Sequence, residues 1–140
     1  MVATWAIAVT VSATSDWYGP FAGRARVFLV FARAPDDVRL GAQRDGLHAG
    51  AAGRTSRDLV VIEVVGPHAD DPRVDGAALR HVYGVSDADF AAILIGKDGG
   101  VKLRTAAPLS GDRLFASIDA MPMRRDELRR EQPPPSGDNH

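Results

Sequence analysis

Four short runs of apolar residues mark the chain, and residues that favour turns follow each of them. The runs at Val27–Phe31 and Leu59–Val65 are nearly continuous and rich in β-branched and aromatic residues, which predicts strands buried on both faces. Phe90–Ile95 predicts a third strand. The run Val101–Thr105, with the sequence VKLRT, alternates apolar and polar residues as a half-exposed strand does. The intervening GKDGG, residues 96–100, has the Asp-Gly pair typical of a hairpin turn.

The helical pattern is weaker than the strand pattern. Residues 37–54 carry several apolar side chains, but glycines at positions 41, 46, 50 and 53 weaken the prediction of a helix there. The HADDPRVD stretch that follows the second strand is predicted to be a loop. Asp75, at its end, is positioned to cap a short helix that stops at Gly84, because aspartate favours helix starts and glycine favours helix ends.

A final helix is predicted to begin at Ser110 or Asp112, and Pro122 either ends it or begins a further helical turn. The elements therefore follow the order β-α-β-α-β-β-α, with two parallel strands joined by a crossover and then an antiparallel hairpin. A mixed four-stranded sheet flanked by helices satisfies this order, so the sequence predicts an α/β protein with a thioredoxin-like fold. We expect residues 17–131 to form this domain and residues 132–140 to be a disordered tail.

The first 16 residues allow two interpretations, a leader or a first strand. Ala3–Ala13 is an apolar run as long as the hydrophobic part of a signal peptide, and Val11 and Ala13 suit a cleavage site. No lysine or arginine precedes the run, however, and its Trp, Ile, Val and Thr residues also favour a β-strand. The run is too short to span a bilayer. We expect a periplasmic or secreted protein if the run belongs to a signal peptide, and a cytoplasmic one otherwise.

Composition narrows the chemistry that is available. The formal net charge is -1, so no overall field favours nucleic acid as a partner. The 140 residues include no cysteine, which excludes thiol–disulfide exchange, peroxiredoxin chemistry and thiolate metal sites. The one cluster of possible metal ligands, His68 with Asp70 and Asp71, is more typical of a solvated loop. We therefore expect neither a metal nor a cofactor.

In a thioredoxin-like fold, the reactive group lies where the first long strand meets its helix, because a helix N-terminus favours an anion. Here that loop runs from Arg33 to Asp37 and contains no nucleophile, and its aspartates, 36 and 37, are expected to be caps. Arg33 either binds an anion beside the helix N-terminus, or it is a solvated loop residue or pairs with one of these aspartates. The proline that this fold places before its third strand is also missing, since its position falls near Asp89-Phe90.

Five segments of the chain together resemble a known family. They are VFLVFARAPDD, RDLVVIEVVG, LRHVYGV, ILIGKDGGVKLR and LFASIDAMPMRRDELRR, and the resemblance covers residues 17–130. They are similar to a domain-of-unknown-function family of small, usually secreted bacterial proteins. This family is related to the repeated module of a vertebrate extracellular-matrix coiled-coil protein and of sushi-repeat proteins, the P-DUDES group. The resemblance implies a peroxiredoxin-like or thioredoxin-like fold without an established activity. The matching motif residues are Lys97, Asp98, Gly99, Gly100, Lys102, Arg104, Asp119, Met121, Pro122, Met123, Arg124 and Glu127.

The charged motif residues have two interpretations. The hairpin and the last helix are neighbours in the thioredoxin core, so Asp119 or Glu127 is expected to bind a cation of the hairpin. The candidate cations are Lys102 and Arg104. The alternative is a cationic patch of Lys102, Arg104 and Arg124 that binds an anionic partner. The sequence favours the structural pairing, because opposite charges near a helix break usually satisfy each other.

We therefore interpret the sequence as a thioredoxin-like protein without a thiol active site that serves as a non-catalytic binding or structural module. Its partner would be a protein, a glycan or a small anion. The alternative is an oxidoreductase-like enzyme with non-thiol chemistry at the Arg33–Asp37 loop, an idea that rests on analogy of fold. A concave pocket with convergent polar groups at this loop would favour the enzyme.

Overall fold

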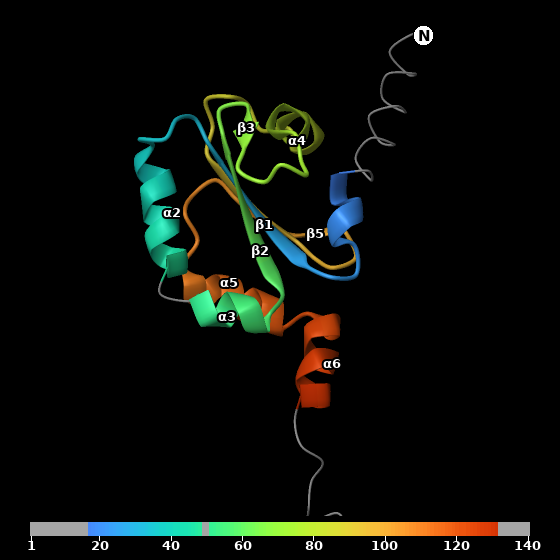
Figure 1. Cartoon of the computed structure of the whole chain (residues 1–140). Coiled ribbons are helices and arrows are strands. Elements are labelled where there is room, and N and C mark those ends of the chain that lie inside the picture. The colour runs from blue at the N-terminus through green and yellow to red at the C-terminus, as the bar shows by residue number, and fades with distance from the viewer. Residues whose placement is uncertain (1–16, 49–50, 132–140) are drawn as a thin grey trace, which may run out of the picture.

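The computed structural model describes residues 17–48 and 51–131, and the strands of this part form one mixed sheet (Figure 1). The strands are β1 (Arg26–Ala32), β2 (Leu59–Val65), β3 (His68–Ala69), β4 (Ala91–Ile95) and β5 (Val101–Thr105). Their order across the sheet is β3-β2-β1-β4-β5. The central strand, β1, runs parallel to β2 and antiparallel to β4.

Helices cover both faces of this sheet. They are the 3-10 turn η1 (Gly19–Phe21) and the α-helices α2 (Val38–His48), α3 (Ala51–Ser56), α4 (Gly76–Tyr83), α5 (Gly111–Asp119) and α6 (Pro122–Glu131). On one face, Phe28 of β1 belongs to a buried cluster with Leu40 of α2 and Leu114 of α5. This face therefore holds the core formed by the crossover between β1 and β2 and by the first of the two C-terminal helices.

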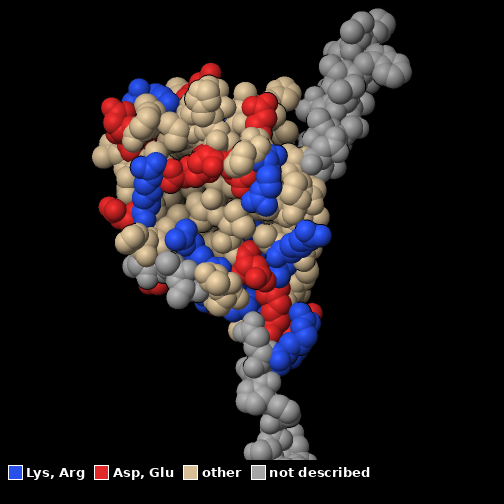
Figure 2. Space-filling model, in the orientation of Figure 1, with Lys and Arg blue, Asp and Glu red and all other residues tan. Residues whose placement is uncertain are grey.

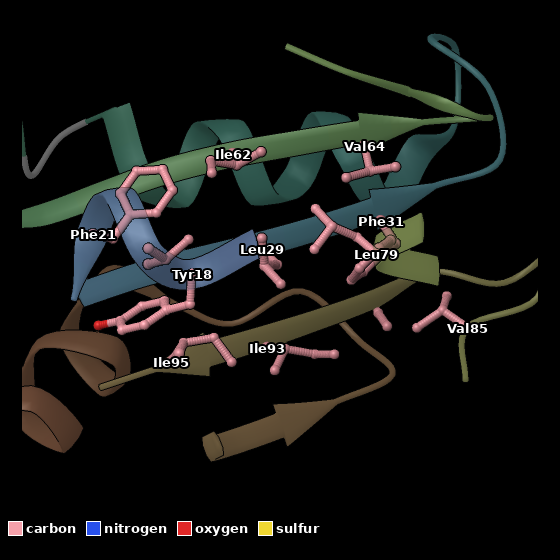
Figure 3. Close-up of a cluster of buried hydrophobic side chains, with 12 residues drawn as sticks. Tyr18, Phe21, Leu29, Phe31, Ile62, Val64, Leu79, Val85, Ile93 and Ile95 are labelled. Carbon is pink, nitrogen blue, oxygen red and sulfur yellow. The ribbon is translucent and has the colours of Figure 1, made fainter. Parts of the chain in front are cut away.

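The opposite face is covered by α4 and η1. Leu29 and Phe31 of β1 point to this side because successive side chains of a strand alternate between faces. Here they meet Leu79 of α4 and Phe21 of η1 (Figure 3). All residues of β1 are consequently buried, as the continuous apolar run predicts. The mixed sheet with helices on both faces confirms the predicted thioredoxin-like α/β fold.

The helix boundaries follow the capping residues expected from the sequence. The Asp75 carboxylate accepts the backbone N–H of Ala77 at 3.3 Å, and Gly84 ends α4 in the left-handed conformation with φ 65°. The Ser110 hydroxyl accepts a backbone N–H of the first turn of α5 at 3.2 Å. Pro122 is the first residue of α6, so of the two roles predicted for it, it begins a further helix.

Three features differ from the prediction. The second strand, β2, is not buried on both faces, because only Leu59, Ile62 and Val64 are buried and its other residues are half-buried. The stretch predicted as a loop contains β3, which pairs with the end of β2 and adds a fifth strand to the four predicted. A strand of two residues is too short to show an alternating pattern. The weak helix predicted for residues 37–54 is two helices, α2 and α3, with residues 49–50 outside the described part. Gly111, the first residue of α5, allows α5 to approach α2, because a β-carbon at this position would lie 2.7 Å from the Gly46 carbonyl oxygen.

The leader or first strand predicted within residues 1–16 and the tail predicted for residues 132–140 lie outside the described residues. In the described part, no helix is both long enough and apolar enough to cross a membrane.

Candidate functional site

The loop at the carboxyl end of β1 holds a buried carboxylate that is already bound. Oδ1 of Asp37 accepts the backbone N–H of Arg39 at 2.9 Å, and Oδ2 lies 3.1 Å from the Arg39 guanidinium. The hydrogen bonds from Arg39 lower the pKa of the Asp37 carboxyl below its ordinary value. Asp37 thus caps α2, as expected. Arg33 and Asp36 are exposed, and Arg33 forms no ion pair with any residue of the described part.

A pocket of about 330 Å³ opens beside this loop. It is lined by Arg39, Gly84, Val85, Asp89, Phe90, Ala91, Arg104, Thr105 and Ala106. The Arg39 guanidinium lies 5.4 Å from the centre of the Phe90 ring, and Arg104 donates a hydrogen bond to the Tyr83 carbonyl oxygen. Asp89 and Phe90 directly precede β4, where the proline of this fold is expected, and no peptide bond among the described residues is cis.

Arg80 holds together the chain segments around the carboxyl end of β1. Its guanidinium donates hydrogen bonds to the carbonyl oxygens of Ala32, Gly66 and Ser86 at 2.7, 2.7 and 2.6 Å. Desolvation lowers the pKa of this buried group. Arg39, Arg80 and Arg104 are therefore held by acceptors of the protein itself, whereas Arg33 is exposed.

The motif residues of the hairpin and of the α5–α6 junction line a second pocket at the opposite end of β1, which we call the hairpin groove. Its volume is about 240 Å³, and it is lined by Arg26, Gly96, Lys97, Asp98, Lys102, Met121, Pro122 and Met123. In the hairpin, Asp98 accepts the Gly100 backbone N–H and pairs with the Lys102 ammonium, each at 2.9 Å. Two motifs that are distant in the sequence therefore meet at one groove.

Beside the hairpin groove, Glu127 of α6 binds two buried cations. Its carboxylate lies 3.2 Å from the Arg26 guanidinium and 2.6 Å from the Lys97 ammonium. Lys97 also pairs with Asp58 at 2.8 Å. Burial alone would raise the pKa of Glu127, but the hydrogen bonds from Lys97 and Arg26 outweigh it and lower the pKa to about 2. One carboxylate therefore connects α6 to the start of β1 and to the turn after β4.

Asp119, the last residue of α5, extends this arrangement. Its carboxylate accepts two hydrogen bonds from Arg57, at 3.0 and 2.8 Å, and lies 3.4 Å from the buried Arg124. Arg124 also lies 3.4 Å from Glu127. The hydrogen bonds from Arg57, followed by those from Arg124, lower the pKa of Asp119. We call this set of side chains the ion network; its members are Arg26, Arg57, Asp58, Lys97, Asp119, Arg124 and Glu127.

The motif carboxylates are thus paired, but with partners other than those predicted. Asp119 and Glu127 bind cations of the ion network and neither Lys102 nor Arg104. Arg124 is only 3% exposed, Lys102 lines the hairpin groove, and Arg104 lines the pocket at the other end of the sheet. These three cations therefore do not form one patch. On the face shown in Figure 2, cationic and anionic side chains are interspersed over the surface.

Sequence reasoning did not identify Arg26 or Arg57 as site residues. Both look like surface residues at the ends of apolar runs, and a single sequence gives no signal that pairs Arg26 with a carboxylate 101 positions away. The position of Arg26 at the start of the central strand is nevertheless a partial indication that it is a site residue. An arginine that begins a central strand is enclosed by neighbouring strands, so it needs a buried acceptor.

The HADD cluster consists of the edge strand β3 and the two aspartates that follow it. Within residues 17–48 and 51–131, no three His, Asp or Glu side chains lie in an arrangement that would hold a metal ion. His68 belongs to the edge strand β3, and Asp70 accepts the Glu63 backbone N–H at 3.0 Å. The cluster therefore stabilises the connection between β2 and β3.

The sheet order, the helices on both faces and the capped β1–α2 loop define a thioredoxin-fold protein with no thiol at the position where the fold usually carries one. The chain belongs to the family described as Domain of unknown function (DUF4174), which matches residues 19–127. This match confirms the resemblance to a domain-of-unknown-function family. A comparison with curated protein sequences finds no match.

Solved structures with a similar fold include peroxiredoxins. Thioredoxin peroxidase I of Plasmodium yoelii aligns with a TM-score of 0.58 and 17% sequence identity, over 85% of this chain and 83% of that chain. The reduced 2-Cys peroxiredoxin of Plasmodium vivax aligns with a TM-score of 0.56 and 16% identity, over 77% of this chain and 83% of that chain. At these identities the likeness establishes the fold alone.

Proposed function

We propose that this protein is a non-catalytic binding module and that the hairpin groove binds an anionic group of its ligand. The observation that carries the proposal is the state of Arg26. This residue is fully buried and lines the groove, and its Nε has no hydrogen-bond partner among the described residues. A buried, unpaired donor costs about 1–3 kcal/mol, so an acceptor oxygen from a ligand gains that much when it reaches the donor.

The charges around the groove also favour an anion. The ion network and the hairpin pair together contain five cationic side chains and four carboxylates. The cations are Arg26, Arg57, Lys97, Lys102 and Arg124, and the carboxylates are those of Asp58, Asp98, Asp119 and Glu127. Of the charged residues that line the groove itself, three are cationic and only Asp98 is anionic. Lys102 is the accessible member, because its pair with Asp98 is exposed and such pairs contribute little.

The enzyme alternative at the Arg33–Asp37 loop has less support. Non-thiol acid–base chemistry needs a carboxylate whose pKa is near the working pH. The pKa of Asp37 is lowered, and both oxygens of its carboxylate are bound by Arg39. The loop itself borders a shallow depression whose rim carries the exposed side chain of Val38. We therefore place the binding function in the hairpin groove.

Thermal unfolding with added phosphate, sulfate and acetate tests this function, with sodium chloride at matched ionic strength as the reference. We expect the anions to raise Tm, and we expect K102Q to remove most of the increase. R104Q is the matched control, because Arg104 lies on the same strand and lines the other pocket. D98N should enlarge the increase, since it releases Lys102 while the amide oxygen still accepts the Gly100 N–H. An equal loss in K102Q and R104Q would contradict the proposal, as would the absence of any anion effect.

We also propose that the protein acts outside the cytoplasm, as the secreted modules of the P-DUDES group do. The apolar run ahead of the domain supports this, and a fold without cysteine needs no particular redox compartment. Expression of the full chain with a C-terminal tag in a bacterium tests it. Recovery from the periplasm of a product lacking residues 1–13 is expected, and an uncleaved cytoplasmic product would contradict it.

A further inference from the structure

Resting on the proposed function, we infer that the ligand of the hairpin groove is an extended protein segment with two adjacent acidic residues, which adds to the sheet as a strand along β5. The first observation is the place of Lys102. It lines the groove from β5, the last strand in the sheet order, whose one strand partner among the described residues is β4. The outward-facing backbone N–H and C=O groups of β5 are therefore available to a further strand.

The side chains of this edge are accessible and cationic. Val101 is 50% exposed, and Lys102 and Arg104 are exposed as well. The pair of Lys102 with Asp98 lies in solvent and contributes little. Arg104 donates a hydrogen bond to a backbone carbonyl oxygen and has no carboxylate partner in the part of the chain that the structure describes. Since β5 itself has no acidic residue, a second copy would set cations against cations, whereas an acidic strand complements the edge.

The two cations point to carboxylates on adjacent residues of the ligand. Lys102 lines the groove together with Met121, which packs against the core on the α5 side of the sheet. Arg104 instead reaches the end of α4, on the other side. The pairing of β4 with β5 shifts between Leu103 and Val101, which leaves Lys102 as an extra residue. Because successive side chains of a strand point to opposite faces, two adjacent carboxylates reach both cations, and two alternate ones reach a single cation.

The edge itself favours a protein segment over other anions. Strand addition forms main-chain hydrogen bonds in step with β5, and an acidic glycan or a free anion has no such backbone. A small anion can occupy the groove at Lys102, but Arg104 lies about 7 Å further along the strand, at about 3.4 Å per residue. Binding that depends on Arg104 as well as on Lys102 therefore distinguishes a strand partner from a small anion.

The test is an NMR titration of the 15N-labelled full chain with capped peptides of about seven residues, long enough to span β5. They consist of valine and threonine with two glutamates in the middle. We expect the peptide with adjacent glutamates to shift the β5 amide signals saturably and to give cross-strand contacts between its Hα atoms and those of β5. The matched control has the same composition with one residue between the glutamates, and it should bind about two- to fivefold more weakly. N-methylation of the residues that face β5 should abolish binding.

Two variants and the small anions define the outcome. K102Q should weaken both the peptide and the anions. R104Q should weaken the peptide by about two- to fivefold without changing the increase in Tm that acetate and phosphate give. Peptide binding that K102Q leaves unchanged would refute the groove as its anion site.

Failure of the strand partner and failure of the anion site can be told apart. If acetate and phosphate raise Tm in a Lys102-dependent way but no peptide pairs with β5, the strand partner is wrong and the anion-binding function stands. The same conclusion follows if an oligogalacturonate binds more tightly than the peptide. It also follows if β5 of the free protein shows cross-strand contacts with a second copy or with residues 1–16. If neither an anion nor a peptide binds, both are wrong.

Discussion

The ion network predicts that a single carboxylate, that of Glu127, contributes a large part of the stability of the domain. In E127Q, the buried Arg26 and Lys97 lose the anion that lies 3.2 and 2.6 Å from them. A pKa that falls from 4.5 to about 2 corresponds to about 3 kcal/mol, at about 1.4 kcal/mol per pKa unit. We expect urea unfolding at pH 7 to show E127Q less stable than the wild type by about this amount, which also matches the usual cost of breaking a buried pair.

The same reasoning fixes how the difference depends on pH. The folded pKa of Glu127 is below the unfolded one, so the unfolded state binds the proton more readily and stability is lost as pH falls. The contribution is complete above the ordinary value of 4.5 and disappears as pH approaches 2. The difference between wild type and E127Q should therefore shrink to about 1 kcal/mol at pH 3. The glutamine variant removes only this titration, so other carboxylates affect both proteins alike.

Asp126 provides the matched control, because it precedes Glu127 on α6 but forms an exposed pair with Arg129. D126N should change stability by no more than about 0.5 kcal/mol. A difference between wild type and E127Q that stays the same at pH 7 and pH 3 would refute the electrostatic reasoning. It would show that shape and packing, and not the charge, make Glu127 important.

Urea unfolding at pH 7 checks three further predictions. G76A should destabilise the protein by roughly 1–3 kcal/mol, because the new β-carbon would lie 2.5 Å from the Pro67 carbonyl oxygen. G41A is the control: a β-carbon there would meet nothing within 4 Å, so this variant should stabilise the helix by about 0.5–1 kcal/mol. Equal effects of the two substitutions would refute the packing argument. R80M should cost about 3 kcal/mol, since three carbonyl oxygens lose a buried donor, and a neutral result would mean that they find other donors. S110A should cost about 1 kcal/mol through loss of the α5 cap, and no change would show that the cap is dispensable.

The parts of the fold that were predictable are those with local causes. Strand periodicity depends on neighbouring residues, so the four longer strands could be placed from their apolar runs. Asp75 and Ser110 were identifiable as caps because a cap binds backbone N–H groups only two or three residues away. The two-residue β3 was missed because it forms only by pairing with β2, and that pairing leaves no repeating pattern in so short a segment.

The candidate site was predictable only in part, because charge pairing is not local. The motif residues led to the hairpin and the α5–α6 junction, which do meet at one groove. Which cation Asp119 binds depends on the position of Arg57, a residue 62 positions away in the turn between α3 and β2. Attraction between charges leaves no repeating pattern in the sequence. Every arginine that looks exposed was therefore an equally good candidate for the partner of Asp119. The burial of Arg26, on which the proposed ligand site depends, results from the assembly of the whole sheet and so could not be predicted from neighbouring residues.

The pairing of Arg26 with Glu127 also affects the order of events while the ribosome synthesises the protein. The two residues are 101 positions apart, so the ribosome releases the second about 5 to 20 s after the first at ordinary rates of elongation. During this interval the nascent chain holds the central strand but not the carboxylate that neutralises its first residue. The ion pair that neutralises Arg26 can therefore form only after the last helix has been made, and until then water has to solvate this cation.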